Sequence, residues 1–126
     1  MTRKHLNARG KGEYSYDYSN DILFFKTKDR DYAKSLDFGN LIADIDTRGF
    51  ITGLRIFDAS KILKIPRISL RNLRNPEFNI EVDGKIITFK LRFSCEIKNK
   101  EVMIGQDFVR ESMNEHIQNS EVICTV

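Results

Sequence analysis

The stretch that decides the fold runs from residue 44 to 63 and reads DIDTRGFITGLRIFDASKIL. Two runs of alternating side chains, residues 41–46 and 50–57, have the period of a strand with one buried face. Gly49 lies between the runs, where a hairpin made of a type I turn and a bulge needs a residue that accepts positive φ. The stretch therefore predicts an antiparallel hairpin.

Two further features of this stretch carry structural predictions. Gly53 lies inside the second run and offers no side chain for packing, which indicates a bulge or the close approach of another segment. Asp58 or Ser60 can accept hydrogen bonds from the open N–H groups that follow. Such an acceptor predicts a helix that starts at Ala59 and continues to Leu63.

Three segments, in a fixed order, carry a resemblance to a known family. They are YDYSNDILFF (16–25), DxDxxG (44–49) and GLRIFDAS (53–60). The chain resembles domain-of-unknown-function family 2283 over roughly residues 14–63. Members of that family open with Tyr-Asp and a nearby Asp, and they close with a segment of the Gly-Ile-Glu-Ile-Leu-Asp-Ala-Ser type. Arg55 stands here where the family has glutamate, so no role of that carboxylate is carried over. The resemblance implies a fold and no particular activity.

The second half of the chain predicts longer strands. Asp83-Gly84 is a strong hairpin signal, and the alternation over residues 87–97 predicts a strand central in its sheet. Residues 28–39 are polar and read as a loop, with a short helical turn around residues 32–36. The chain ends in an apolar strand over residues 120–126. We predict a mostly β fold of the α+β class, with antiparallel hairpins or a meander and one or two short helices.

The length of 126 residues favours one domain. We predict a basic flexible tail over residues 1–12 and a single domain over 13–126. The domain would consist of a family-like half, residues 14–63, and a second group of strands, residues 77–126. Strands at both chain ends would leave exposed sheet edges, which favour a homo-oligomer.

The composition is typical of a cytoplasmic globular protein, with 40% hydrophobic and 31% charged residues. The N-terminal residues contain no apolar stretch of the kind that signals secretion, and no run is long enough to span a membrane. Cys95 and Cys124 lie on apolar strand-like runs, where packed, reduced thiols are favoured over a disulfide.

Positive charge is concentrated in two segments. The tail holds four cations and no acid, which leaves −1 for residues 13–126 out of the total of +3. It is either a phosphate-binding arm or a solvated terminus. The second segment, residues 61–74, has two interpretations. It is a contact surface for nucleic acid or for an acidic partner, or it is the solvated face of a crossover that Pro66 divides into two turns. The candidate binding residues are Arg3, Lys4, Arg9, Lys11, Lys61, Lys64, Arg67, Arg71 and Arg74.

Tyrosines recur at every second position of the first predicted strand, as Tyr14, Tyr16 and Tyr18. Such a stripe beside a basic tail could stack nucleic-acid bases. The alternative is a half-buried sheet surface whose hydroxyl groups reach polar partners.

Catalytic patterns are scarce. His5 and His116 are the two histidines, and together with the distant cysteines they do not form a zinc spacing. Asp44 and Asp46 share a strand face and could bind a divalent cation, although turn roles account for the same residues. No nucleophile elbow or phosphate loop is present, and no cofactor is implied.

The sequence thus favours a small non-enzymatic binding or regulatory module. We expect it to self-associate and to contact nucleic acid or a protein partner through its basic segments. The alternative is a divalent-metal-dependent hydrolase that uses Asp44, Asp46 and neighbouring carboxylates.

Overall fold

The computed structural model describes the backbone of residues 6–28, 31–112, 117 and 119–125, and the side chains of these residues from Gly12 onward. The described strands and helices, in chain order, are β1 (Leu6–Asp17), β2 (Ile22–Thr27), β3 (Tyr32–Asp37), β4 (Leu41–Asp46), β5 (Ile51–Phe57), α1 (Ala59–Leu63), the 3-10 helix η1 (Arg67–Arg71), β6 (Arg74–Asp83), β7 (Ile86–Ile97), β8 (Lys100–Glu111) and β9 (Ser120–Thr125).

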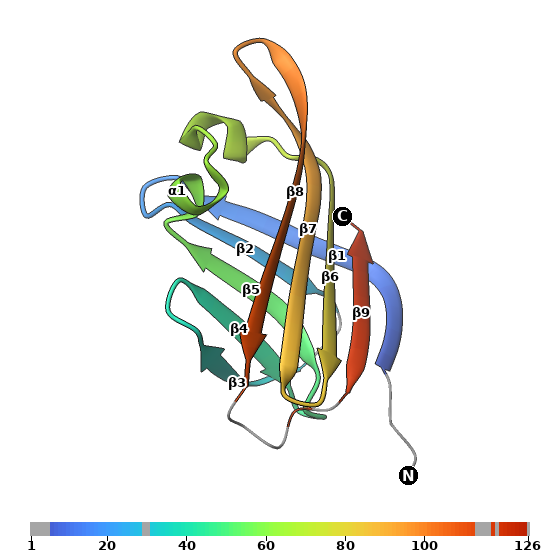
Figure 1. Cartoon of the computed structure of the whole chain (residues 1–126). Helices are drawn as coiled ribbons and strands as arrows, with labels where there is room; N and C mark the ends of the chain where they lie inside the picture. Colours follow the sequence, from blue (N-terminus) through green and yellow to red (C-terminus); the bar gives the residue numbers. More distant parts are fainter. Residues whose placement is uncertain (1–5, 29–30, 113–116, 118, 126) are drawn as a thin grey trace.

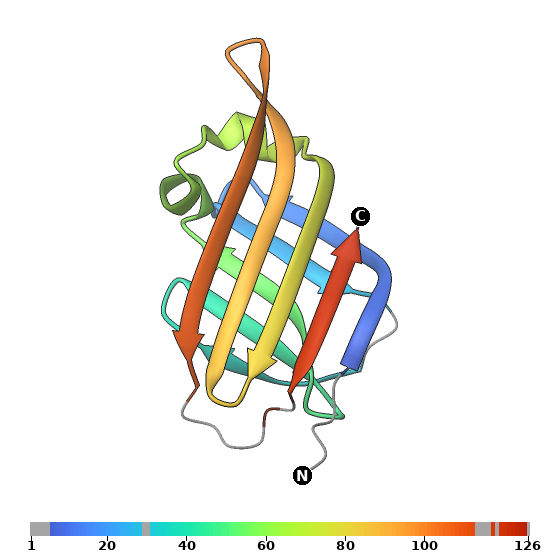
Figure 2. The ribbon, with the colours of Figure 1, turned by 45° about the vertical axis from the view of Figure 1, so that its right-hand side comes forward.

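The nine strands form two layers that face each other (Figures 1 and 2). They are hydrogen-bonded in the order β3-β4-β5-β2-β1-β9-β6-β7-β8. One layer contains β3, β4, β5, β2 and the second half of β1; the other contains the first half of β1 with β9, β6, β7 and β8. The predicted mostly β architecture is confirmed, with very little helix. No helix in the described part of the chain is long and apolar enough to cross a membrane.

Strand β1 belongs to both layers. Its residues 6–11 pair in parallel with β9, and its residues 12–17 pair antiparallel with β2. Gly12 lies at the change of partner, where a Cβ atom would stand 3.0 Å from the Cβ of Cys124 and 3.2 Å from the ring of Phe78. A residue without a side chain therefore lets the strand pass between the layers.

The prediction of a flexible tail is wrong for residues 6–12, because they form strand β1. Residues 6–11 pair with β9, which is more than 100 residues away along the chain, and Gly12 pairs with Thr27 of β2. Residues 1–5 lie outside the described residues.

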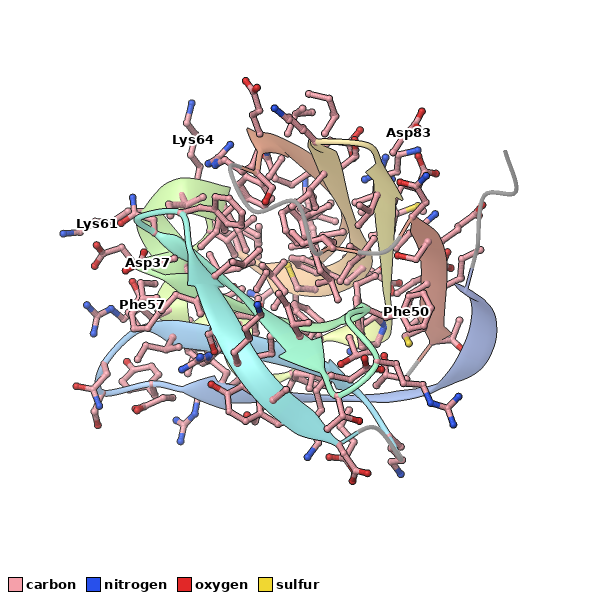
Figure 3. All side chains as sticks on the ribbon, turned by 90° about the horizontal axis from the view of Figure 1, so that it is seen from below. Asp37, Phe50, Phe57, Lys61, Lys64 and Asp83 are labelled. Carbon is pink, nitrogen blue, oxygen red and sulfur yellow. The ribbon has the colours of Figure 1, made fainter. Side chains whose placement is uncertain are left out.

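The hydrophobic core fills the space between the two layers (Figure 3). Phe25 from β2 and Phe78 from β6 are both buried, and their ring centroids are 5.5 Å apart. Both cysteines are buried free thiols, as predicted. The Cys124 sulfur lies 3.1 Å from the hydroxyl oxygen of Thr27, which adds a polar contact between the layers.

The β4–β5 hairpin has the predicted structure. Gly49 has φ 87°, and the N–H of Asp46 donates to the carbonyl of Phe50 at 2.9 Å. The register between the two strands shifts after Asp44. A Cβ on Gly53 would lie 3.2 Å from Asp44 Oδ2 and 3.2 Å from the carbonyl oxygen of Phe25, so the predicted close approach is made by the Asp44 side chain and the backbone of β2.

The two later hairpins also have tight turns. Gly84 has φ 62° at the first of two loop residues, which confirms the predicted turn. Lys98 and Asn99, both with positive φ, form the two-residue connection between β7 and β8. Strand β7 was predicted to be central in its sheet. It is an interior strand, with β6 on one side and β8 on the other, but it lies next to the edge of the strand order rather than at its centre.

Two other predictions are wrong. Residues 32–37 form strand β3 instead of a loop with a helical turn. This strand is an exposed edge with mostly polar side chains, so its alternation is weak. The terminal strands are not sheet edges, because β1 and β9 pair with each other in the middle of the strand order; the edges are β3 and β8.

Candidate binding site

The first and third family-like segments, residues 16–25 and 53–60, meet at the buried carboxylate of Asp21, which is 1% exposed. Its Oδ1 accepts hydrogen bonds from the Tyr16 hydroxyl at 2.6 Å and from the Ser60 N–H at 3.0 Å. Its Oδ2 accepts one from the Ser60 hydroxyl at 2.6 Å, and the Arg67 Nε lies 3.8 Å away. The carboxylate therefore ties the end of β1 to the start of α1.

The electrostatics of this cluster keep Asp21 ionised and Tyr16 neutral. Burial by itself would raise the pKa of Asp21, but hydrogen bonds from Ser60 and Tyr16 and the charge of Arg67 hold that pKa below its ordinary value. Burial raises the pKa of Tyr16, and the hydrogen bond to Asp21 raises it further. Neither group titrates near neutral pH, where an acid or base catalyst is most effective. We assign the cluster a structural role.

The cap of helix α1 was predicted at the wrong residue. Asp58 occupies the cap position with φ 52°, but its side chain makes no capping hydrogen bond. Asp21, 39 positions before Ser60, performs that role instead. Its carboxylate accepts from the N–H of Ser60, and its backbone carbonyl accepts from the N–H of Ala59 at 3.0 Å. The spacing of Tyr16, Asp21 and Ser60 within the family-like segments is the signal that could have identified this contact.

The two candidate metal ligands have separate roles. Asp46 is buried, and its Oδ1 accepts from the N–H groups of Arg48 and Phe50 in the hairpin turn. Asp44 pairs with Arg55 at 2.9 Å and accepts from the Ser35 hydroxyl at 2.8 Å. Across the described residues, no three histidine, cysteine, aspartate or glutamate side chains gather in a way that could hold a metal ion.

The basic residues of the N-terminal segment are only partly described. Arg3 and Lys4 lie outside the described residues. Arg9 and Lys11 belong to β1, opposite Ile123 and Thr125 of β9, and their side chains are not among those described.

Three cations of the second basic segment already have partners within the chain. Arg67 approaches Asp21 and donates to the carbonyl of Tyr18 at 3.2 Å. Arg71 lies over the Tyr18 ring, 4.9 Å from its centroid. Arg74 lies 3.9 Å from Glu96 and 3.6 Å from Glu101. These contacts attach the segment to the sheets.

The tyrosine stripe also has internal partners. The Tyr14 hydroxyl accepts from the N–H of Leu73 at 3.1 Å, and its ring packs near Phe25. Together with the Tyr16 and Tyr18 contacts, this favours the interpretation of the stripe as a half-buried sheet surface that holds residues 59–73 in place.

Lys61 and Lys64 differ from the three arginines of the segment. Both are exposed and make no ion pair with the described residues. Figure 3 shows their side chains pointing away from the core. Pro66 and the positive φ of Lys64 divide the segment into α1 and η1, as predicted.

A cleft of about 690 Å³ lies between η1 and the connection from β7 to β8. Pro66, Ile68 and Ile97 give it apolar walls, and Ile68 is 61% exposed. Its polar lining consists of Ser69, Asn72, Arg74, Glu96, Lys98 and Asn99. The arrangement combines exposed apolar surface with hydrogen-bonding and charged groups, which is the usual chemistry of a binding site.

Charge in the cleft favours an anionic ligand. Arg74 shares its charge with two glutamates, whereas Lys98 makes no ion pair with the described residues. Lys98 sits at a tight turn, so its backbone position is fixed by the hairpin. Arg74 belongs to the predicted basic segment, whereas Lys98 was not predicted as a binding residue, because its local sequence indicates only a turn between two strands.

Comparison with known proteins finds a matching family model and two similar proteins. A family model described as "Protein of unknown function (DUF2283)" matches residues 13–60. A Methanosarcina mazei protein named "Putative hypoxanthine phosphoribosyltransferase" is 34% identical over 95 residues, which cover 75% of this chain and 77% of that protein. An uncharacterised protein of Methanocaldococcus jannaschii is 28% identical over 94 residues, covering 74% and 81%. No solved structure gives a significant match.

Proposed function

This chain belongs to the DUF2283 family of proteins of unknown function, and we propose that it is a small cytoplasmic, non-enzymatic binding module. Its cleft between η1 and the β7–β8 connection holds an extended, acidic segment of a partner protein. The observation that carries the proposal is the pairing of exposed apolar walls with Lys98 at the same cleft. An extended peptide presents side chains alternately, so an apolar residue can enter the cleft while its acidic neighbours face the cations.

A protein partner is favoured over nucleic acid because most cations of the second basic segment already have partners within the chain. Nucleic-acid binding needs several cations available to phosphates. Arg67, Arg71 and Arg74 are held in contacts with the chain's own carboxylates or with an aromatic ring, which leaves Lys61 and Lys64 as the two cations of the segment without an ion pair among the described residues. The exposed apolar side chain of Ile68 is better matched by another apolar side chain than by a phosphate backbone.

We do not extend the phosphoribosyltransferase name of the archaeal relative to this chain. That activity requires a site for phosphate groups, which commonly uses free N–H groups at a helix start. In α1 the first two N–H groups, those of Ala59 and Ser60, already donate to Asp21. The metal-dependent alternative is not favoured either, because Asp44 and Asp46 are engaged separately.

Fluorescence anisotropy tests the proposal with labelled peptides of defined charge. One peptide alternates leucine with glutamate, a second alternates leucine with lysine, and a third probe is single-stranded DNA. We expect the glutamate peptide to bind and the lysine peptide to bind at least about tenfold more weakly, a difference of about 1.4 kcal/mol. Tighter binding of DNA than of either peptide would overturn the proposal in favour of a nucleic-acid module.

Two variants with matched controls locate the binding surface. Ile68→Ser removes an exposed apolar wall, and Lys98→Asn removes the cation while keeping a residue that accepts φ 51°. The controls, Ile86→Ser and Lys85→Asn, change an exposed isoleucine and a hairpin lysine at the other end of β7. Both cleft variants should weaken peptide binding and both controls should leave it unchanged; equal effects would refute the assignment of the cleft.

A further inference from the structure

The two sheet edges differ in how they are protected against pairing. Strand β3 is six residues long and carries an irregularity between Tyr32 and Lys34. Short length, bulges and charged side chains are the devices that block edge pairing. Strand β8 has twelve residues in continuous register with β7, from Lys100 to Glu111, without a bulge. Its open edge presents a long row of N–H and C=O groups.

Strand β8 also exposes apolar side chains on one face. Met103 is 86% exposed and Val109 is 57% exposed. Both belong to the alternate set of β8 residues that faces away from the core, whereas Phe108 of the other set is buried. Strand β8 is the last strand in the hydrogen-bonded order, and Figure 2 shows it as the outermost strand of its layer. Within the described part of the chain, no further strand pairs with the open edge of β8 beside these two side chains.

We propose that β8 pairs antiparallel with β8 of a second copy of this chain, in a register centred on Gln106. The two-fold axis that relates two such antiparallel edge strands must be perpendicular to the sheet. Residues that lie opposite each other in the two copies then point to the same face, and their residue numbers add up to the same even value for every pair. Centring on Gln106 places Met103 opposite Val109 of the second copy on the outer face. Ile104 then lies opposite Phe108 on the inner face. This register matches apolar residues on both faces, each pair being worth a few tenths to about 1 kcal/mol.

Charges are compatible with this register. Asp107 faces Gly105 of the second copy, and its charge is already compensated by Arg92 at 2.8 Å. Glu101 faces Glu111 at the ends of the paired region, and Glu101 has Arg74 at 3.6 Å. The self-association proposed here concerns β8 alone and stands independently of the cleft.

A charge-swap experiment tests both the edge and the register. The double variant Met103→Lys with Val109→Lys places lysines directly opposite each other at two sites of the pair, and Met103→Glu with Val109→Glu does the same with glutamates. Both positions are exposed, so the fold of each variant should be retained, as circular dichroism can verify. Sedimentation should find the unchanged protein as a dimer of 14.7 kDa chains and each double variant as a monomer.

Mixing the lysine and glutamate variants should restore a dimer that contains one chain of each. Tyr32→Lys, an exposed position on the opposite edge, is the control and should remain dimeric. A monomeric unchanged protein would overturn the proposal. So would a Tyr32→Lys monomer, a dimer in either double variant, or a mixture that stays monomeric.

Discussion

Replacement of Asp21 by asparagine tests the hydrogen-bond cluster of Tyr16, Asp21 and Ser60, which joins the first and third family-like segments. The change keeps the shape of the side chain and accepts the left-handed backbone at φ 56°. It removes the charge and replaces one of two acceptor oxygens with a donor group. Hydrogen bonds to a charged group contribute about 1.5–3 kcal/mol each. Of the three bonds from Tyr16 and Ser60, we expect the equivalent of two to be lost, a destabilisation of about 3–6 kcal/mol.

The pH dependence of this loss has a definite sign. Because the folded state lowers the pKa of Asp21, the unfolded chain takes up the proton first as the pH falls. The stabilisation is therefore complete above the unfolded pKa of about 3.9 and disappears as the pH falls through the folded value. The stability difference between the unchanged protein and Asp21→Asn should be constant from neutral pH to about pH 5 and should narrow below about pH 4.

Urea unfolding followed by circular dichroism, at one protein concentration and at several pH values, measures both effects. Asp17 also has a lowered pKa, through its hydrogen bonds with Asn20, but it is the same in both proteins and cancels. The matched control is Asp58→Asn, because Asp58 is exposed, shares the left-handed backbone and makes no capping bond. That variant should change the free energy of unfolding by less than about 0.5 kcal/mol. Equal effects of the two variants, or a stability difference that persists at low pH, would refute the assigned role of Asp21.

Three further predictions follow from the packing and the polar contacts. Gly12→Ala should lower the free energy of unfolding by about 1–3 kcal/mol in urea, because its methyl group would meet Cys124 at 3.0 Å; a neutral effect would mean that β1 does not pass so close. Cys95, whose pKa burial raises, and Cys124 should react with dithionitrobenzoate only after unfolding, and rapid reaction of the native protein would contradict their burial. Millimolar magnesium, manganese or calcium should leave the thermal midpoint unchanged, whereas an increase would revive the metal site at Asp44.

The hairpins were predictable because their signals are local. The alternation around Gly49 and the dipeptide Asp83-Gly84 each identify a turn within a few residues, and both turns have the positive φ that glycine supplies. Strand 86–97 was clear for the same reason, since one face is apolar throughout and buried.

The missed features depend on partners that are distant in the sequence. The polar first half of β1 is a strand only because β9 lies beside it, and no local pattern carries that parallel pairing. The cap of α1 comes from Asp21 rather than from the adjacent Asp58. The cleft is likewise formed by two segments about 30 residues apart, around Ile68 and Lys98, so neither segment alone identifies it.

The most direct test of the proposed function is a titration of ¹⁵N-labelled protein with the leucine–glutamate peptide, followed by the backbone amide shifts. Binding at the cleft predicts the largest changes at Ile68, Asn72, Lys98 and Asn99, with little change at Asp44 on the opposite layer. Changes concentrated elsewhere, or no change at saturating peptide, would contradict the account.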